Sequence, residues 1–260
     1  MQTPTAERQS SAIRGSDEAG RVILKDRLRK WGWRMNRPWK LSPSDFAFLW
    51  EECRRCFYLK VVRGIQRPRP IMPKIFTAID LQMKEFFAGQ RTRDLLASLP
   101  AGRVEGGDKW VESVPLSAGS HQSQFFIRGK LDTVLKLDDG SYAVIDFKTS
   151  ETKSEHLPLY ARQLNAYALS LENAAPGKFV LKPVTRLGLV VYEPEIFKAE
   201  PQGGASLEGS MTWIEVSRQD GDFLGFMDEV LDVLDQTAPP VGSPGCEWCA
   251  YRDASRRTGL

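Results

Sequence analysis

The sequence has no long apolar run and little net charge. No stretch approaches the roughly eighteen apolar residues that a membrane span requires, and residues 1–20 contain no apolar segment of the kind found in a signal peptide. The 36 Lys and Arg residues and 33 Asp and Glu residues leave a formal charge of +3, and there is no internal repeat or low-complexity block. Because 42% of the 260 residues are hydrophobic, a sizeable core can form. We therefore expect a cytoplasmic globular protein.

Cysteine is also scarce, with four residues in the chain. In a reducing compartment, so few cysteines favour metal ligation over a disulfide framework. All four fall into two C-x-x-C pairs, Cys53/Cys56 and Cys246/Cys249, and the first pair lies in a predicted helix that would present both sulfurs on one face. Zinc and a [4Fe-4S] cluster both accept four thiolates, and the spacing does not separate them. Packed free thiols are a third interpretation.

Apolar periodicity and turn residues predict alternating helices and strands. We expect a disordered tail over 1–20 and a single domain over 21–260, in which a cysteine site joins 41–74 to 240–260. Helices are predicted over 43–62, 75–88, 92–99, 157–171 and 220–235, and strands over 110–116, 125–137, 141–149, 186–192 and 211–216, with a glycine-rich loop at 195–209. Helices on both sides of a mostly consecutive set of strands indicate an α/β fold.

The segment Asp138-Asp139-Gly140 predicts a three-residue hairpin loop with its glycine in the left-handed conformation. Facing residues would then be equally distant from Asp139, which places Asp132 opposite Asp146, while Lys148 shares a face with Asp146. A two-residue turn at Asp139-Gly140 would instead shift the register by one residue. A divalent cation would relieve the repulsion between the two acids, since Mg²⁺ takes one or two carboxylates and fills its shell with water and phosphate oxygens. The alternative is an ion pair between Asp132 and Lys148 on a solvated sheet face.

Three motifs now stand in order: GKLD at 129–132, DFK at 146–148 and QLNAY at 163–167. This string resembles the PD-(D/E)XK nuclease superfamily, in its RecB-like exonuclease branch, and the resemblance spans roughly residues 41–251. It implies a restriction-endonuclease-like core, a mixed central sheet flanked by helices. It also implies that Asp132 and Asp146 hold Mg²⁺ or Mn²⁺, that Lys148 orients the attacking water, and that Gln163 and Tyr167 position the substrate or the ligands. The alternative for the last two residues is a polar helix edge packed on the sheet.

The resemblance carries two departures. The first family motif is a helix that often reads G-x-x-x-H, and here Asp80 stands at the histidine position, so Asp80 is expected as a metal ligand, with Glu85 as a weaker option. Some relatives, including CRISPR-associated nucleases and a helicase-nuclease subunit, hold a [4Fe-4S] cluster with one N-terminal and three C-terminal cysteines. Ser255 replaces the last of these here, so Cys56 would have to take its place. The resemblance favours iron and sulfur, with structural zinc as the alternative.

The region from Arg21 to Lys74 is basic, with fifteen Lys and Arg residues against four acids. Cations and rings alternate along it: Arg29, Lys30, Trp31, Trp33, Arg34, Arg37, Trp39, Lys40, and then Arg54, Arg55, Lys60, Arg63, Arg67 and Arg69. Such a region suits phosphates and unpaired bases, although core tryptophans and solvated arginines would look alike. We expect a DNA exonuclease acting on single strands or free ends in repair, recombination or defence, with a helicase or defence-complex partner. The alternative is a non-catalytic nucleic-acid-binding or scaffolding subunit.

Overall fold

The computed structural model describes residues 37–68, 71–149 and 154–258. The chain divides after Arg37 into two units, and every element below belongs to the second, Pro38–Leu260. The tail predicted over 1–20, the tryptophans Trp31 and Trp33 with their basic neighbours, and Arg69 lie outside the described residues.

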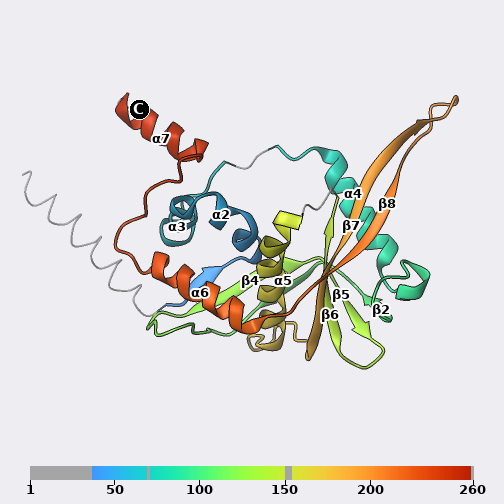
Figure 1. Ribbon diagram of the computed structural model, residues 1–260, viewed down its shortest axis with the longest axis horizontal. Helices are drawn as coiled ribbons and strands as arrows, with labels where there is room; N and C mark the ends of the chain where they lie inside the picture. The colour runs from blue at the N-terminus through green and yellow to red at the C-terminus, as the bar shows by residue number, and fades with distance from the viewer. Residues whose placement is uncertain (1–36, 69–70, 150–153, 259–260) are drawn as a thin grey trace, which may run out of the picture. The chain divides into compact units, whose positions relative to one another are not determined.

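Strands of the described chain form two sheets (Figure 1). The three-stranded sheet has the order β1-β4-β3, with β1 and β4 parallel, and the five-stranded sheet has the order β2-β5-β6-β7-β8, with β6 and β7 parallel and its other pairs antiparallel. The strands are β1 (Trp39–Leu41), β2 (Gly102–Glu105), β3 (Lys109–Glu112), β4 (Phe125–Leu131), β5 (Thr133–Leu137), β6 (Tyr142–Lys148), β7 (Val184–Ala199) and β8 (Ala205–Val216). With helices on the faces of these mixed sheets, the predicted α/β class is confirmed.

The hairpin between β5 and β6 has the predicted register. Thr133 pairs with Ile145, Lys136 pairs with Tyr142, and Gly140 is left-handed with φ 88°. The prediction of one strand over 125–137 is wrong, because the chain leaves the ladder at Asp132 and passes from one sheet into the other. Asp132 is therefore not paired across the ladder with Asp146, and its side chain is free to turn toward the end of β6.

Two helices cover opposite faces of the five-stranded sheet. Helix α5 (Leu157–Glu172) packs on the face that carries Val134, Val144 and Leu189, and it also lies across β4 (Figure 1). Helix α4 (Lys74–Phe87) uses Met83 and Phe87 to cover the other face, which carries Leu135, Ala143 and Ile145. Consecutive residues of β5 such as Val134 and Leu135 are both apolar, because they point to opposite faces and each face of the sheet has its own helix.

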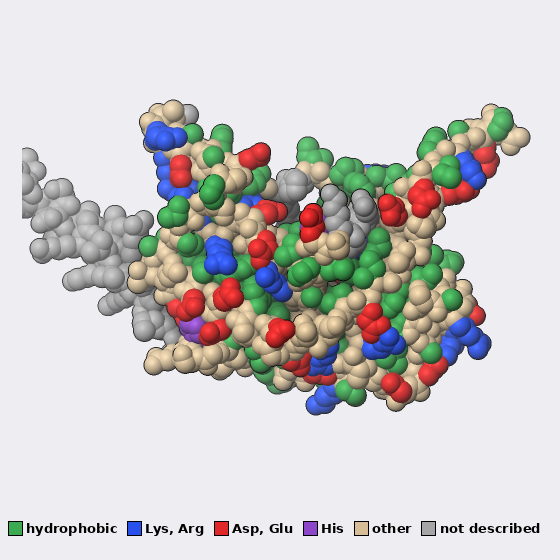
Figure 2. Space-filling model, viewed as in Figure 1, with side chains coloured by type: hydrophobic (Ala, Val, Ile, Leu, Met, Phe, Trp, Pro, Cys, Tyr) green, Lys and Arg blue, Asp and Glu red, His purple; other side chains and the backbone are tan. Residues whose placement is uncertain are grey.

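Helix α4 is only partly buried. Ile75, Phe76, Leu81 and Phe86 on its outer side are exposed, and Figure 2 shows apolar side chains gathered over this helix. The helix predicted over 92–99 is reduced to one 3₁₀ turn at Thr92–Asp94. Within the described residues, no helix is both long and apolar enough to cross a bilayer.

The helix predicted over 43–62 is interrupted. A π-helical turn at Asp45–Leu49 leads into α2 (Trp50–Glu52), Cys53 is extended with φ −167° and ψ 106°, and α3 (Arg54–Arg63) begins after it. Apolar periodicity continues through the break because Phe46, Trp50 and Phe57 all enter one aromatic core with Phe226 of α6 (Asp220–Leu234). The interruption makes Cys53 an N-cap residue and not a residue within a helix.

The loop predicted over 195–209 is in fact the outer part of β7 and β8. The two strands pair from Leu187 with Val216 out to Ala199 with Ala205, with an irregularity at Pro194. Their outer ends project from the sheet, where Ile196 and Phe197 are exposed (Figure 1). Glycine and proline in this stretch suggested a loop, but a two-stranded ribbon in solvent tolerates them because it lies at a sheet edge.

Candidate functional site

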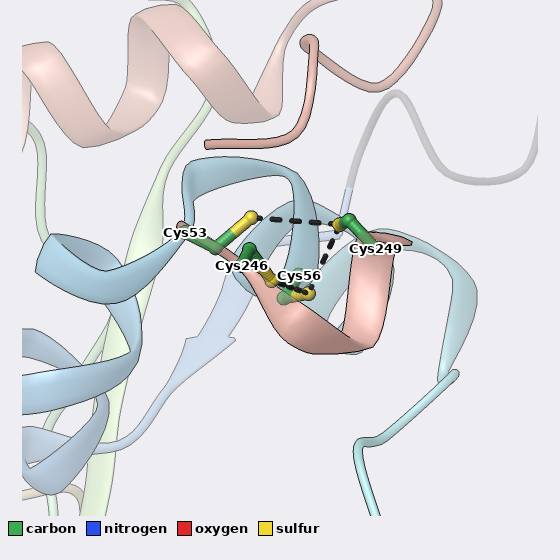
Figure 3. Close-up of side chains that lie close together, drawn as sticks. All are labelled: Cys53, Cys56, Cys246 and Cys249. Carbon is green, nitrogen blue, oxygen red and sulfur yellow. Dashed lines mark hydrogen bonds between the residues drawn. The ribbon is translucent and has the colours of Figure 1, made fainter. Parts of the chain in front are cut away.

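The four cysteines come together although the two pairs are nearly 200 residues apart. Their sulfurs all lie within 4.8 Å of one another, and all four side chains are buried (Figure 3). Cys53 is the N-cap of α3 and Cys246 is the N-cap of α7 (Glu247–Arg257), while Cys56 and Cys249 stand three residues into those helices. Both pairs therefore use the same position at a helix start, and two helix N-termini face the sulfurs.

Positive groups surround the sulfurs. The guanidinium of Arg67 donates a hydrogen bond of 3.3 Å to Cys246 Sγ, and the N-termini of α3 and α7 add partial positive charge. Burial opposes ionisation of Cys53, but hydrogen bonds from the backbone of Ser243 and Cys56 outweigh it and lower its pKa to about 6. Burial raises the pKa of Cys249. Burial also raises the pKa of Cys56, so the environment favours the thiolate, which is the form that binds metals, at Cys53.

The sulfur spacing tests which group fits the site. Cys53 Sγ lies 3.7 Å from Cys249 Sγ, and Cys56 Sγ lies 3.7 Å from Cys246 Sγ and 3.6 Å from Cys249 Sγ. A tetrahedral zinc ion with Zn–S bonds of about 2.3 Å has sulfurs about 3.8 Å apart. A four-iron cube would hold the thiolates considerably further apart. The donor set therefore fits a single tetrahedral ion.

The second cluster lies where β6 meets α5. Asp146 is 5% exposed, and its Oδ1 accepts a hydrogen bond of 2.9 Å from Gln163 Nε2, while Oδ2 forms an ion pair with the Lys148 ammonium. Burial raises the pKa of Asp146 to about 6. Burial also works against the charge on Lys148, but the Asp146 carboxylate outweighs it and raises the pKa of this lysine. The Lys148 ammonium lies 4.6 Å from the centre of the Tyr160 ring, which was not singled out from sequence.

The packing of Tyr167 explains the glycine of the GKLD motif. The Tyr167 hydroxyl donates a hydrogen bond of 2.7 Å to the carbonyl of Lys130 in β4. A Cβ at Gly129 would lie 3.2 Å from the Tyr167 ring and 2.8 Å from Pro43 Cδ. Glycine at 129 thus lets the ring and the strand approach closely. The first and third motifs are in direct contact, and together they fix the strand that ends at Asp132.

Asp132 lies beside β6, the strand that carries Asp146 and Lys148. Its Oδ2 accepts a hydrogen bond of 3.0 Å from the backbone N–H of Phe147, and its Oδ1 lies 2.9 Å from Lys84 Nζ. The same ammonium lies 2.9 Å from Asp80 Oδ2 and 3.3 Å from Asp108 Oδ1. The oxygens of Asp80 and Asp132 are therefore at most twice 2.9 Å apart.

Lys84 and Asp108 were missed from sequence. Lys84 follows Asp80 by four residues on a predicted helix, which was a usable signal for an ion pair. Nothing local marks Asp108, which reaches the cluster because its backbone N–H bonds to the Asp132 carbonyl. Burial works against the charge on Lys84, but Asp80 and Asp132 outweigh it and raise its pKa. Glu85 is exposed on α4.

The acids fit a divalent ion in chemistry, although they do not form a closed cage. Among described residues, the four cysteines are the one group of three or more such ligands gathered closely enough to hold an ion, and Asp80, Asp132 and Asp146 do not form a second. Asp146 Oδ2 is buried against the Lys148 ammonium, and an ion bound to this oxygen would share it with that ammonium or take its place. An open site of a few carboxylates, completed by water and phosphate, is what Mg²⁺ prefers.

Several residues of the basic region have structural partners. Arg55 pairs with Asp253, Lys60 with Asp45, and Arg67 with Glu52 and Cys246. Trp39 donates to Asp235 over 3.2 Å, and Arg54 lies over the Trp50 ring. These contacts bind the segment to α6, α7 and the cysteine site, so part of its positive charge is paired with acidic groups within the fold.

Comparison with known proteins shows the family. No curated protein matches the sequence. Among solved structures, one titled "Crystal structure of SSO0001" aligns with 91% of this chain and 95% of its own, at 15% identity and a TM-score of 0.47. The model of the PD-(D/E)XK nuclease superfamily matches residues 82–254, about two thirds of the chain, and this segment contains all three motifs. The chain belongs to the PD-(D/E)XK nuclease superfamily.

Proposed function

We propose that this protein is a Mg²⁺- or Mn²⁺-dependent deoxyribonuclease of the RecB-like type, and that it acts as an exonuclease in DNA repair, recombination or defence. Family membership supports phosphodiester hydrolysis with divalent metals. The observation that carries the proposal is the buried Asp146, whose two oxygens meet Gln163 and Lys148 while Asp132 bonds to the next residue of the same strand. We also propose that 21–260 act as one nuclease domain.

In this proposal, Asp132 and Asp146 hold the ion, and Asp80 contributes from α4. The bound ion would polarise the phosphoryl group and lower the pKa of a water molecule. Gln163 fixes Asp146 Oδ1, so that Oδ2 keeps its orientation. Lys148, held over Tyr160, offsets the charge that develops on the phosphoryl oxygens. Tyr167 anchors β4 at Lys130 and so holds the strand that carries Asp132.

The test is cleavage of end-labelled linear DNA and of circular single-stranded DNA, with Mg²⁺ or Mn²⁺. The wild type should degrade linear DNA from its ends and leave circles intact. Asp146→Asn and Lys148→Met should lower the rate by at least a hundredfold. Asp80→Asn should cleave DNA more slowly than the wild type, whereas Glu85→Gln on the same helix should cleave it at the wild-type rate. Inactive wild-type protein that still binds DNA would favour the non-catalytic scaffold instead.

For the cysteine site, we propose one structural zinc ion held by Cys53, Cys56, Cys246 and Cys249. Three of the sulfur–sulfur distances, 3.6 to 3.7 Å, and the limit of 4.8 Å on all of them support zinc over the iron–sulfur cluster that the family resemblance implies. Anaerobically purified protein should be colourless and contain one zinc per chain by elemental analysis. A brown protein with four irons and a visible absorption band would favour the cluster.

A further inference from the structure

One face of the three-stranded sheet is open to solvent. Along β4 the burial alternates, with Phe125, Ile127, Gly129 and Leu131 buried and the residues between them half-buried or exposed. The buried face of β4 packs on α5. The other face carries Lys40 of β1, Trp110 and Glu112 of β3, and Phe126, Arg128 and Lys130 of β4. We call these six residues the open face.

The open face presents an unusual exposed aromatic side chain. Trp110 is 60% exposed although it lies within a strand, and the Arg128 guanidinium lies 5.4 Å from the centre of its ring. Trp110 pairs with Lys130 across the sheet, and Lys40 pairs with Phe126. A flat ring flanked by cations is suited to a base that stacks and a phosphate that follows it.

Charge on the open face favours an anionic ligand. Three cations stand against one acid, since Lys40, Arg128 and Lys130 outnumber Glu112. Arg128 contacts Glu112 at 3.3 Å, and Lys130 contacts Asp108 at 2.9 Å, but all of these side chains except Glu112 are nearly half exposed. Such exposed pairs contribute little stability, so a phosphate can displace the carboxylate at low cost.

The open face leads directly to the acidic cluster. Lys130 contacts Asp108, Asp108 contacts Lys84, and Lys84 contacts Asp132. A chain of ion pairs thus runs from Lys130, which faces Trp110 across the strands, to Asp132, which follows the end of β4. A bound strand that follows the cations would reach the cluster within a few nucleotides.

We propose that the open face binds single-stranded nucleic acid next to the cleavage site, with one base stacked on Trp110 and the adjacent phosphates on Arg128 and Lys130. This rests on the proposed nuclease function. It assigns strand binding to the β3–β4 surface, which includes Lys40 of the basic region that the sequence suggested. Duplex DNA offers no unpaired base to stack, so its binding should depend little on Trp110.

The test is fluorescence anisotropy with labelled oligo(dT), oligo(rU) and a DNA duplex, on the full chain without added divalent ions. Trp110→Ala should weaken oligo(dT) binding by roughly 5- to 150-fold, the range expected for one lost stacked base. Trp110→Phe should retain most of the affinity. Phe197→Ala removes an exposed ring on the outer part of β7 and should change nothing. Lys130→Gln should reduce the salt dependence of the binding affinity by about one released counterion.

Equal affinity of Trp110→Ala and wild type, or an equal loss in Phe197→Ala, would overturn the proposal. If Trp110→Ala lost more affinity for the duplex than for single strands, the proposal would also be overturned, because base stacking would then not explain the role of Trp110. Oligo(rU) bound as tightly as oligo(dT) would extend the site to RNA and still support it. If the wild type cleaves DNA but binds it equally well without Trp110, the proposed nuclease function stands and only the binding role of the open face is rejected.

Discussion

Replacing Gly129 with alanine tests the contact between the GKLD strand and α5. The added methyl group would lie 2.8 Å from Pro43 Cδ and 3.2 Å from the Tyr167 ring, so both must move. Overpacking of this kind costs roughly 1 to 3 kcal/mol. In a chain of this size, each kcal/mol lowers the melting temperature by about 2 to 4 °C. We therefore expect Gly129→Ala to melt roughly 2 to 12 °C below wild type.

A matched glycine provides the control. Gly225 lies in the interior of α6, and a Cβ there would have no heavy atom within 4 Å. Gly225→Ala should raise the stability by roughly 0.5 to 1 kcal/mol, because alanine loses less conformational entropy in a helix. Thermal unfolding of the three purified proteins, with cleavage rates measured in parallel, gives the comparison. If Gly129→Ala is as stable as wild type, the close approach of Tyr167 to β4 is not what requires glycine.

Three further predictions concern charged residues and the cysteine site. Arg218→Met should cost roughly 1 to 3 kcal/mol, because Arg218 contacts Glu172 through both guanidinium ends. Arg218 lowers the pKa of Glu172. This stabilisation is therefore present above the ordinary glutamate pKa and is lost as the pH falls through the lower pKa of the folded protein. Urea titrations between pH 3 and 7 should show that the variant loses less stability on acidification than the wild type. Lys84→Met removes the cation beside Asp132, so Mn²⁺ should raise the melting temperature more than in wild type, and a smaller rise would contradict competition between the lysine and the ion. Cys249→Ser should lose the bound ion in elemental analysis and unfold at a lower temperature, because the binding free energy of a structural ion contributes to folding, whereas full ion content would argue against a four-thiolate site.

The sequence predicted those parts of the fold whose signals are local. The hairpin register followed from one turn, because Gly140 at its left-handed position fixes which residues of β5 and β6 face each other. Helices α5 and α6 followed from apolar periodicity, since each has one face in a core. The approach of the three motifs could be predicted because the hairpin from β5 to β6 returns the chain that follows Asp132 to the side of Asp146, and the third motif lies in α5, which contacts both β4 and β6.

Other features depended on contacts distant in sequence. The apolar pattern around Cys53 is helical, and the break there follows from a site completed by Cys246 and Cys249. The outer ends of β7 and β8 carry little apolar alternation, so their composition resembles a loop. Asp132 was expected within a strand, but it lies between two sheets that the sequence did not distinguish. Lys84 enters the acidic cluster because α4 crosses the sheet there.

The position of the cysteine pairs also orders the events of biosynthesis. Cys53 and Cys56 leave the ribosome early, but their two partners follow nearly 200 residues later, on a helix that begins after Cys246. Until then the first pair can hold an ion only with borrowed ligands such as water or small thiols. A completed site is therefore formed only on a polypeptide that has been translated as far as Cys249, and a prematurely terminated chain would expose two reactive thiols instead.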